Sequence, residues 1–143
     1  MLRRLLFAFL LVVGTFLLGF GIGKERAVRA EAKARVFEIR TYTANDGKLE
    51  ALQARFRQHT TKLFERHGMT NIGYWSPQDS PLSKNTLIYI LAFPSREAAK
   101  RSWEEFRNDP DWKKVQQESE VNGKLVSKVE SVFADPTDYS PIQ

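Results

Sequence analysis

Apolar and polar positions repeat with a changing period along this chain, and the period predicts short strands and helices after an apolar N-terminal segment. Two-residue alternation or continuous apolar character marks the strands, and three- to four-residue spacing marks the helices. Gly, Pro and Asn residues separate most of these segments. We expect strands at 36–43, 69–76, 86–93 and 125–133, and helices at 47–67, from 95 to about 107, and from 110 to about 122.

The order of these elements is βαββαβ, with the second helix divided at Asp109–Pro110. That order predicts an α+β, ferredoxin-like fold in which the first and third strands are central and both helices cover one face of the sheet. The run at 86–93, TLIYILAF, is apolar almost throughout, as expected for a strand at the sheet centre. The other sheet face would be bare in a monomer, whereas in a dimeric α/β-barrel two such faces close on each other.

The first helix is predicted to bury one stripe of side chains. Asn45 is a candidate N-cap for this helix, and Gly68 supplies its C-terminal stop. Three- and four-residue steps between them define the stripe. Its members are Leu49, Leu52, Phe56, His59 and Leu63.

The first strand has one apolar face and one polar face. Phe37 and Ile39 alternate with Glu38, Arg40 and Tyr42 along it. We expect the apolar face to pack on the helices. The polar face would then line the bare side of the sheet, where a second subunit would enclose it.

Residues 1–30 predict a signal peptide or a membrane anchor. Two arginines precede Leu5–Gly23, which carries no charge over 19 residues. At about 1.5 Å per residue, this segment is just long enough to cross a ~30 Å hydrocarbon core. Small-residue sites at 28–30 and 32–34 favour cleavage, whereas the basic flank at 24–35 resists translocation. Either outcome predicts an exported domain, periplasmic or secreted, whose membrane contact is this segment if it stays uncleaved.

The net charge of +5 and the pI near 9.6 derive mainly from the leader. Beyond residue 30 the chain holds 17 basic and 16 acidic residues, which argues against a nucleic-acid partner. Cysteine is absent, which excludes disulfides, thiolate metal sites and cysteine catalysis. The sequence has no glycine-rich phosphate loop and no paired-histidine motif, so we expect no cofactor and no metal site.

Several short motifs in the folded part share their order and spacing with a known family. They are VFEIRTYT at 36–43, GKL at 47–49, FERHG at 64–68, IGYW at 72–75 and SREAA at 95–99. Together they resemble the NIPSNAP domain family, in particular small bacterial members with an N-terminal leader and a single domain. The resemblance implies a dimeric α/β-barrel fold and no specific chemistry. We expect this domain at 36–134, followed by an extended C-terminal tail at 135–143.

Six side chains are candidates for lining a ligand pocket, and each also has a structural explanation. Glu38 and Arg40 could orient a polar ligand or form a structural ion pair. His59 could be a heme ligand, a general base or a satisfied core histidine. Tyrosines in strands are mostly packing residues, although their hydroxyls could enter a pocket. The candidates are Glu38, Arg40, Tyr42, His59, Tyr74 and Tyr89.

Two classes of function remain after these considerations. The first is an exported, homodimeric module that binds a small molecule or another protein, with no assigned activity. The second is an enzyme, a cofactor-independent or heme-linked monooxygenase of the kind found among dimeric α/β-barrels, which rests on fold analogy alone. Single-stranded RNA binding is disfavoured, because the domain is nearly neutral and places an acidic residue on its first strand.

Overall fold

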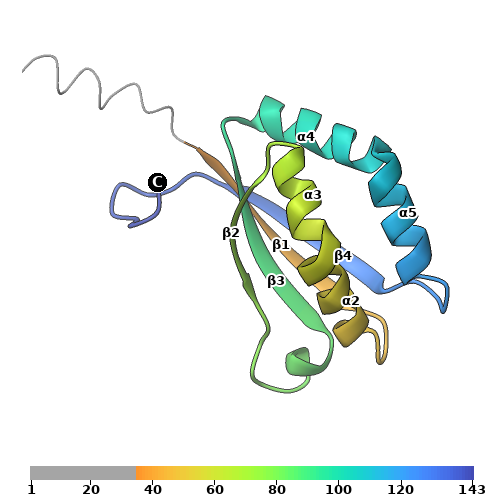
Figure 1. The fold of residues 1–143 in the computed structure, drawn as a ribbon. Helices are drawn as coiled ribbons and strands as arrows, with labels where there is room; N and C mark the ends of the chain where they lie inside the picture. The colour runs from red at the N-terminus through yellow and green to blue at the C-terminus, as the bar shows by residue number, and fades with distance from the viewer. Residues whose placement is uncertain (1–34) are drawn as a thin grey trace, which may run out of the picture. The chain divides into compact units, whose positions relative to one another are not determined.

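A four-stranded antiparallel sheet carries its α-helices on one face, and a short 3-10 helix, η2 (Leu82–Lys84), lies in the loop between β2 and β3 (Figure 1). The computed structural model describes residues 35–143, so the predicted leader lies outside the described residues. The strands follow one another across the sheet in the order β2-β3-β1-β4, with β1 and β3 at the centre. Their bounds are Val36–Ala44 for β1, Thr70–Trp75 for β2, Thr86–Phe93 for β3 and Val126–Ala134 for β4.

This topology confirms the predicted α+β, ferredoxin-like βαββαβ fold. In β1, Arg40 pairs with Tyr89 of β3 on one side and with Ser131 of β4 on the other. The register is continuous along β1 and β3, and it shifts near Thr43 and Ala44 against β4. The two central strands therefore present their side chains in aligned cross-strand rows, which sets the geometry of everything packed on them.

The helical layer consists of two arms. The first arm runs through α2, η1 and α3, and the second through α4 and α5. Ser95 caps α4 by accepting a hydrogen bond from the Ala98 N–H at 3.1 Å, and Asp109 caps α5 by accepting one from the Asp111 N–H at 2.8 Å. The bounds are Leu49–Arg55, Phe56–Thr60, Thr61–Arg66, Arg96–Asn108 and Pro110–Ser119 in that order.

The first arm contains a π-helical turn, η1, that the sequence pattern did not predict. A π turn takes up more residues than an α turn, so it advances the buried stripe by one position. Thr60 is buried as a result, and His59 is exposed. The predicted place of His59 on the apolar stripe is therefore wrong. The N-cap prediction for Asn45 is also wrong, since its side chain instead donates to the Lys124 carbonyl at 2.7 Å.

The two faces of β1 are the reverse of those we predicted. Glu38 faces the helical side, because the indole Nε1–H of Trp103 on α4 donates a hydrogen bond to its carboxylate at 2.6 Å. Tyr42 packs edge-on against Phe56 of η1, with ring centroids 5.9 Å apart. Ile39 faces the open side and is 37% exposed. The error has a physical cause: both sheet faces are rich in apolar residues, so polarity alone could not say which face meets the helices.

The open sheet face is apolar over much of its area. Ile39 pairs across strands with Val132, which is 61% exposed, and Trp75 on β2 is 50% exposed. A Cβ atom at Gly73 would lie 2.6 Å from the Trp75 indole, so the glycine allows this ring to lie against the sheet. The open face is therefore a candidate contact surface.

The C-terminal tail, residues 135–143, forms no helix or strand. It turns back on itself through a hydrogen bond from the Ser140 N–H to the Thr137 carbonyl at 3.0 Å, so it is not the extended segment we predicted. Pro136 and Ile142 line a hollow with Phe37 at one end of the open face. In residues 35–143 we find no helix that is both long and apolar enough to span a membrane.

Candidate functional site

A buried polar cluster lies between the sheet and α4. The Glu38 side chain is almost fully buried, and three groups donate to its carboxylate at 2.6 Å: Arg40 Nη1, Ser131 Oγ and Trp103 Nε1. The Arg40 guanidinium also lies 4.2 Å from the centre of the Trp103 ring. This arrangement satisfies a buried charge by pairing and hydrogen bonding, as buried carboxylates require. The ion pair offered as the structural explanation of Glu38 and Arg40 is present.

Three of the candidate tyrosines meet around one phenylalanine. Tyr89 is fully buried, stacks on Tyr74 at 5.4 Å and meets the edge of Tyr42 at 5.2 Å, measured between ring centroids. Phe56 of η1 contacts all three rings. The Tyr89 hydroxyl has no hydrogen-bond partner among residues 35–143. The cluster is thus mainly packing, with one unsatisfied hydroxyl in it.

Two of these tyrosines have strongly raised pKa values. Burial raises the pKa of Tyr89 well above its usual range, and Tyr42 raises it further while Arg40 lowers it. Burial also raises the pKa of Tyr74, with Glu65 and Tyr42 adding to the effect. Both phenols therefore stay protonated at neutral pH. They can donate a hydrogen bond there, but they cannot act as phenolate bases.

A cavity of about 290 Å³ lies between the helical layer and the β1–β4 half of the sheet. Its walls are about equally apolar and polar. Tyr42, Phe56 and Trp112 are among its aromatic members. Its charged members are Arg55, Glu120, Lys124 and Lys128.

The π turn places two of the residues that line this cavity. Phe56 opens η1 and Thr60 closes it, and both are buried. The side-chain hydroxyls of Thr60 and Thr61 donate to the Arg55 and Phe56 carbonyls at 3.3 and 3.2 Å, which helps to satisfy the widened turn. π turns inside α-helices are often found at functional sites. The cavity therefore coincides with an irregularity that a purely structural helix would not need.

Arg55 is the buried charge of this cavity. Its side chain is 5% exposed, and its Nη1 donates to Glu120 Oε1 at 3.1 Å and to Ser119 Oγ at 3.3 Å. Its guanidinium lies 5.2 Å from the centre of the Trp112 ring. The buried Nε–H has no hydrogen-bond partner among the described residues. Arg55 is thus a paired cation that keeps unused donors.

The structure separates the six predicted pocket residues. Tyr42 lines the cavity, Glu38 and Tyr89 are buried beside it, and Arg40 is half-buried there. Tyr74 lines a different cleft of about 280 Å³, between the first helical arm and β2. His59 is exposed and lines neither space.

Sequence reasoning missed most of the cavity's other residues. The π turn brings Thr60 onto the inner side of the helix, a shift that a regular helical repeat could not reveal, and the burial of the charged Arg55 depends on its partner Glu120. Trp112 and Glu120 come from the second arm, and only the folded topology places them opposite the first. A charged residue directly before the aromatic Phe56 was the one available signal.

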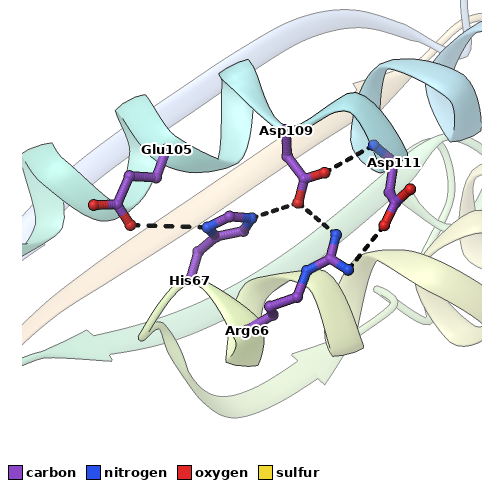
Figure 2. A network of polar contacts seen from close by, with 5 residues as sticks. All are labelled: Arg66, His67, Glu105, Asp109 and Asp111. Atoms are coloured by element: carbon purple, nitrogen blue, oxygen red, sulfur yellow. Dashed lines mark hydrogen bonds and ion pairs between the residues drawn. The ribbon is translucent and has the colours of Figure 1, made fainter.

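A second polar network joins the two helical arms at the start of α5 (Figure 2). One Asp109 oxygen meets Arg66 Nη2 at 2.5 Å and His67 Nε2 at 2.6 Å, while the other caps the helix. Burial alone would raise the pKa of Asp109, but the hydrogen bonds from His67 and Arg66 outweigh it and lower the pKa to about 2. Asp111 and Glu105 complete the network on its exposed side. His67 is thus a structural partner of a buried carboxylate.

Within residues 35–143, no group of three or more His, Asp or Glu side chains is placed to hold a metal ion. The described polar groups instead form ion pairs with Arg, as at Glu38 and Asp109.

Comparison with known protein families identifies the family of this chain. The NIPSNAP family profile matches residues 37–141, which is most of the sequence. This chain belongs to the NIPSNAP family. The match confirms the resemblance carried by the short motifs, and among the curated proteins none matches this NIPSNAP chain.

Solved structures of other family members share the fold. A NIPSNAP family protein of unknown function from Agrobacterium tumefaciens is 21% identical, with a TM-score of 0.67 over 78% of this chain and 96% of that one. A NIPSNAP-like domain protein from Burkholderia xenovorans is 16% identical, with a TM-score of 0.66 over 76% of this chain and 90% of that one. Their similarity extends over the described NIPSNAP domain.

A structure from outside the family also matches. SnoaB, a cofactor-independent oxygenase from Streptomyces nogalater, is 16% identical, with a TM-score of 0.53 over 76% of this NIPSNAP chain and 98% of that chain. At this identity the likeness concerns the fold alone. With the family structures, it confirms the predicted fold class, that of the dimeric α/β-barrel group.

Proposed function

We propose that this domain binds a small organic molecule in the cavity between the helical layer and the β1–β4 half of the sheet. The observation that carries the proposal is the cavity itself, which combines aromatic walls, a buried cation and a π turn. Ligand sites are typically concave and mostly apolar, with a few polar groups that fix orientation. The cavity is concave and has aromatic walls on one side, and its polar share is larger than in most such sites.

The size of the cavity limits its ligand. An apolar cavity of about 150 Å³ binds benzene. The volume here, about 290 Å³, is close to twice as large and suits a ligand of two fused rings. The rings would lie among Phe56, Phe106 and Trp112, where aromatic stacking adds to the burial of apolar area.

Calorimetric titration with 2-naphthamide, a neutral two-ring probe, tests the proposal. A probe of this size should bind with a dissociation constant of about 1 mM, at roughly 0.3 kcal/mol per heavy atom. Val129 lines the cavity and is partly exposed, so Val129→Trp should fill the cavity and abolish binding. Val121 is 75% exposed and does not line the cavity, which makes Val121→Trp the matched control. Equal binding by both variants would exclude this cavity as the site.

We propose that the functional unit is a homodimer closed through the open sheet faces. Ile39, Trp75 and Val132 lie exposed on that face, and burying such apolar area drives association. The cavity lies on the opposite, helical side of the sheet. Each subunit would therefore carry its own complete ligand site.

An exported location is part of the same proposal. It rests on the uncharged run Leu5–Gly23 and on the small-residue sites after it. N-terminal sequencing of the protein from its own host tests it. A new N-terminus after residue 30 or 34 would support cleavage, and an intact Met1 would exclude it.

Cofactor-independent oxygenation is the second candidate function, and the fold likeness to SnoaB favours it. The heme-linked alternative lacks the iron ligand that we considered for it, because His59 is exposed and lies outside the cavity. The test is oxygen uptake with 1-naphthol, an electron-rich two-ring phenol. Uptake that Val129→Trp abolishes and Val121→Trp retains would support an enzyme, and no uptake would leave a binding protein.

A further inference from the structure

The C-terminal tail, residues 135–143, folds into a hydrogen-bonded turn that presents an exposed tyrosine. The Ser140 N–H donates to the Thr137 carbonyl at 3.0 Å, and Gln143 Nε2 donates to the same carbonyl at 3.1 Å. Arg35 Nε, just ahead of β1, donates to the Gln143 carbonyl at 2.8 Å and fastens the turn to the domain. Tyr139 lies within the turn and is 83% exposed. Its ring forms no hydrogen bond or ring contact among residues 35–143, so no contact within the described subunit explains its position.

An exposed aromatic ring on an ordered turn is well suited to a partner. Chain ends are usually poorly ordered unless they are tied down. A ring that is already held in place loses little conformational freedom on binding, and tyrosine is enriched among the residues that dominate interface energies. The neighbouring Asp138 is also exposed, and its carboxylate forms no ion pair with any residue of 35–143. The turn therefore presents an aromatic ring with an available carboxylate beside it.

The cleft of about 280 Å³ between the first helical arm and β2 has the complementary composition. Phe56, Tyr74 and Trp75 line it, and Trp75 is 50% exposed. Among the described residues that line the cleft, Arg57 alone is charged. Its side chain is 66% exposed and lies 4.0 Å from the carboxylate of Glu50, which is itself 83% exposed, so the guanidinium is accessible to another carboxylate. An aromatic ring with an adjacent acid therefore matches this cleft in shape and in charge.

The tail and the cleft lie at diagonally opposite corners of the sheet. β2 and β4 are the two edge strands, the tail follows the last residue of β4, and the cleft lies at the last residues of β2 (Figure 1). β2 runs parallel to β1, because both are antiparallel to β3, whereas β4 runs antiparallel to β1. The two edge strands therefore end at opposite ends of the sheet. The tail, fastened at its own corner by Arg35, cannot place Tyr139 in the cleft of its own subunit.

A second copy of the chain brings the two corners together. In a two-fold dimer each contact between two different residues is made twice. When two open faces pack with the axis along the other diagonal of the sheet, the tail corner of each copy lies over the cleft corner of its partner. The strands of the two sheets then cross at nearly right angles, which is one of the two common ways for sheets to pack face to face.

We infer that Tyr139 of each copy enters the cleft of the partner subunit and that Asp138 pairs there with Arg57 of the partner subunit. The inference rests on the homodimer of the proposed function and names residues that join its two copies. Tyr139 packs against the exposed Trp75, and the acid lies at the charged rim of the cleft. The tail thus connects the two subunits without entering the ligand cavity.

Sedimentation velocity over a dilution series measures the dissociation constant of the dimer. Tyr139→Ala should weaken the dimer about 30-fold, as expected for the loss of an interface anchor. Arg57→Glu brings two carboxylates together and should weaken it about tenfold, and adding Asp138→Lys to Arg57→Glu should recover most of the affinity. Val121 is 75% exposed outside the tail and the cleft, so the control Val121→Ala should leave the constant unchanged.

Thiol cross-linking tests the contact directly, because the chain contains no cysteine. Arg57→Cys and Asp138→Cys are produced in the protein's own host, mixed, left to exchange subunits and treated with a short bis-maleimide. A covalent dimer that contains one chain of each variant should form. Glu118→Cys, with a side chain that is 66% exposed on α5, replaces Asp138→Cys as the control and should give no such product.

The outcomes distinguish this inference from the proposed function. If the wild type is monomeric, the proposed dimer fails and the inference fails with it. If Val132→Glu, which places a charge on the open face, dissociates the dimer while Tyr139→Ala and Arg57→Glu leave its dissociation constant unchanged, the open-face dimer stands and the tail contact is excluded. Equal cross-linking by Asp138→Cys and Glu118→Cys would also exclude that contact. A thermal unfolding scan of each variant confirms that it is folded.

Discussion

At the scale of single residues, buried carboxylates decide how the helical layer is attached to the sheet. Glu38 receives its donors from β1, β4 and α4, so one carboxylate connects three elements. Asp109 likewise connects the two helical arms, through Arg66 and His67 (Figure 2). Losing one hydrogen-bond donor to a buried charge costs more stability than losing an exposed hydrogen bond, because the buried group cannot form a replacement hydrogen bond with water.

Replacing Trp103 with Phe tests the donor to Glu38. The change keeps an aromatic ring but removes the Nε1–H, which donates to the carboxylate at 2.6 Å. We expect the free energy of unfolding to fall by about 1.5 to 3 kcal/mol, the range for a hydrogen bond to a charged group. Trp112→Phe is the matched control, since Trp112 also lies under an arginine but donates no hydrogen bond to a described residue. Urea unfolding measures both, and equal losses would contradict the prediction.

The lowered pKa of Asp109 predicts that the fold loses stability in acid. Its pKa falls from 3.8 to about 2 in the folded state, so the unfolded chain binds its proton more readily. The stabilisation is complete above about pH 5 and declines as the pH drops through 3.8 toward 2. Melting temperatures between pH 6 and pH 3 should fall less steeply for Asp109→Asn than for the wild type. Asp79→Asn, in an exposed loop, should retain the wild-type slope. Parallel slopes in all three would refute this role.

At the scale of elements, η1 determines which residues of the first arm face inward. Phe56 and Thr60 occupy its two ends, and Leu63 and Phe64 of α3 enter the core after it. Each residue of an α-helix turns the chain by about 100°. Without the extra residue of the π turn, α3 would present a different face to the sheet.

Deleting Gln58, which is exposed within η1, should therefore be severe. The first arm would become a regular α-helix, and Leu63 and Phe64 would rotate out of the core. We expect a loss of more than about 3 kcal/mol, comparable to truncating a large core residue. Gln58→Ala should change the stability by less than about 0.5 kcal/mol. Chemical unfolding compares the two, and a well-tolerated deletion would show that η1 does not set the register.

Element order and type could be predicted from the sequence, because hydrophobic period, Gly68, Ser95 and Asp109–Pro110 are local signals. Which face of β1 packs against the helices could not be predicted from the sequence. Its polar residues are satisfied by Trp103 and Ser131, which come from segments far along the chain. Alternation shows that a strand has two faces, but partners distant in sequence decide which of them is inside.

The candidate site shows the same limit. Tyr42, Tyr74 and Tyr89 could be named as candidate pocket residues from the sequence, but their packing against one another and the separate spaces that Tyr42 and Tyr74 line depend on the fold. Arg55 could not be singled out, because its burial and its pairing with Glu120, which lies 65 residues further along the chain, depend on the fold. Whether any of these residues binds a ligand stays a prediction.

At the scale of the whole molecule, the sheet has two faces with different tasks. The helical face carries the core, the buried charges and the cavity. The open face carries exposed apolar side chains, and the C-terminal tail covers one end of it. A molecule built this way can associate through one face without disturbing the site on the other.

We predict that the protein forms a dimer through the open face, and a single charge introduced on that face can test this. Val132 is 61% exposed on β4, so Val132→Glu should leave the subunit folded while placing a carboxylate in the proposed interface. An unpaired charge buried between apolar sheets is strongly unfavourable. Light scattering after size exclusion, at micromolar concentration, should find a dimer for the wild type and for Val121→Glu, whose site is exposed and off the sheet. Val132→Glu should be monomeric. A monomeric wild type, or a dimer that tolerates Val132→Glu, would show that the open face is not the interface, and the exposed Trp75 would then require a different partner.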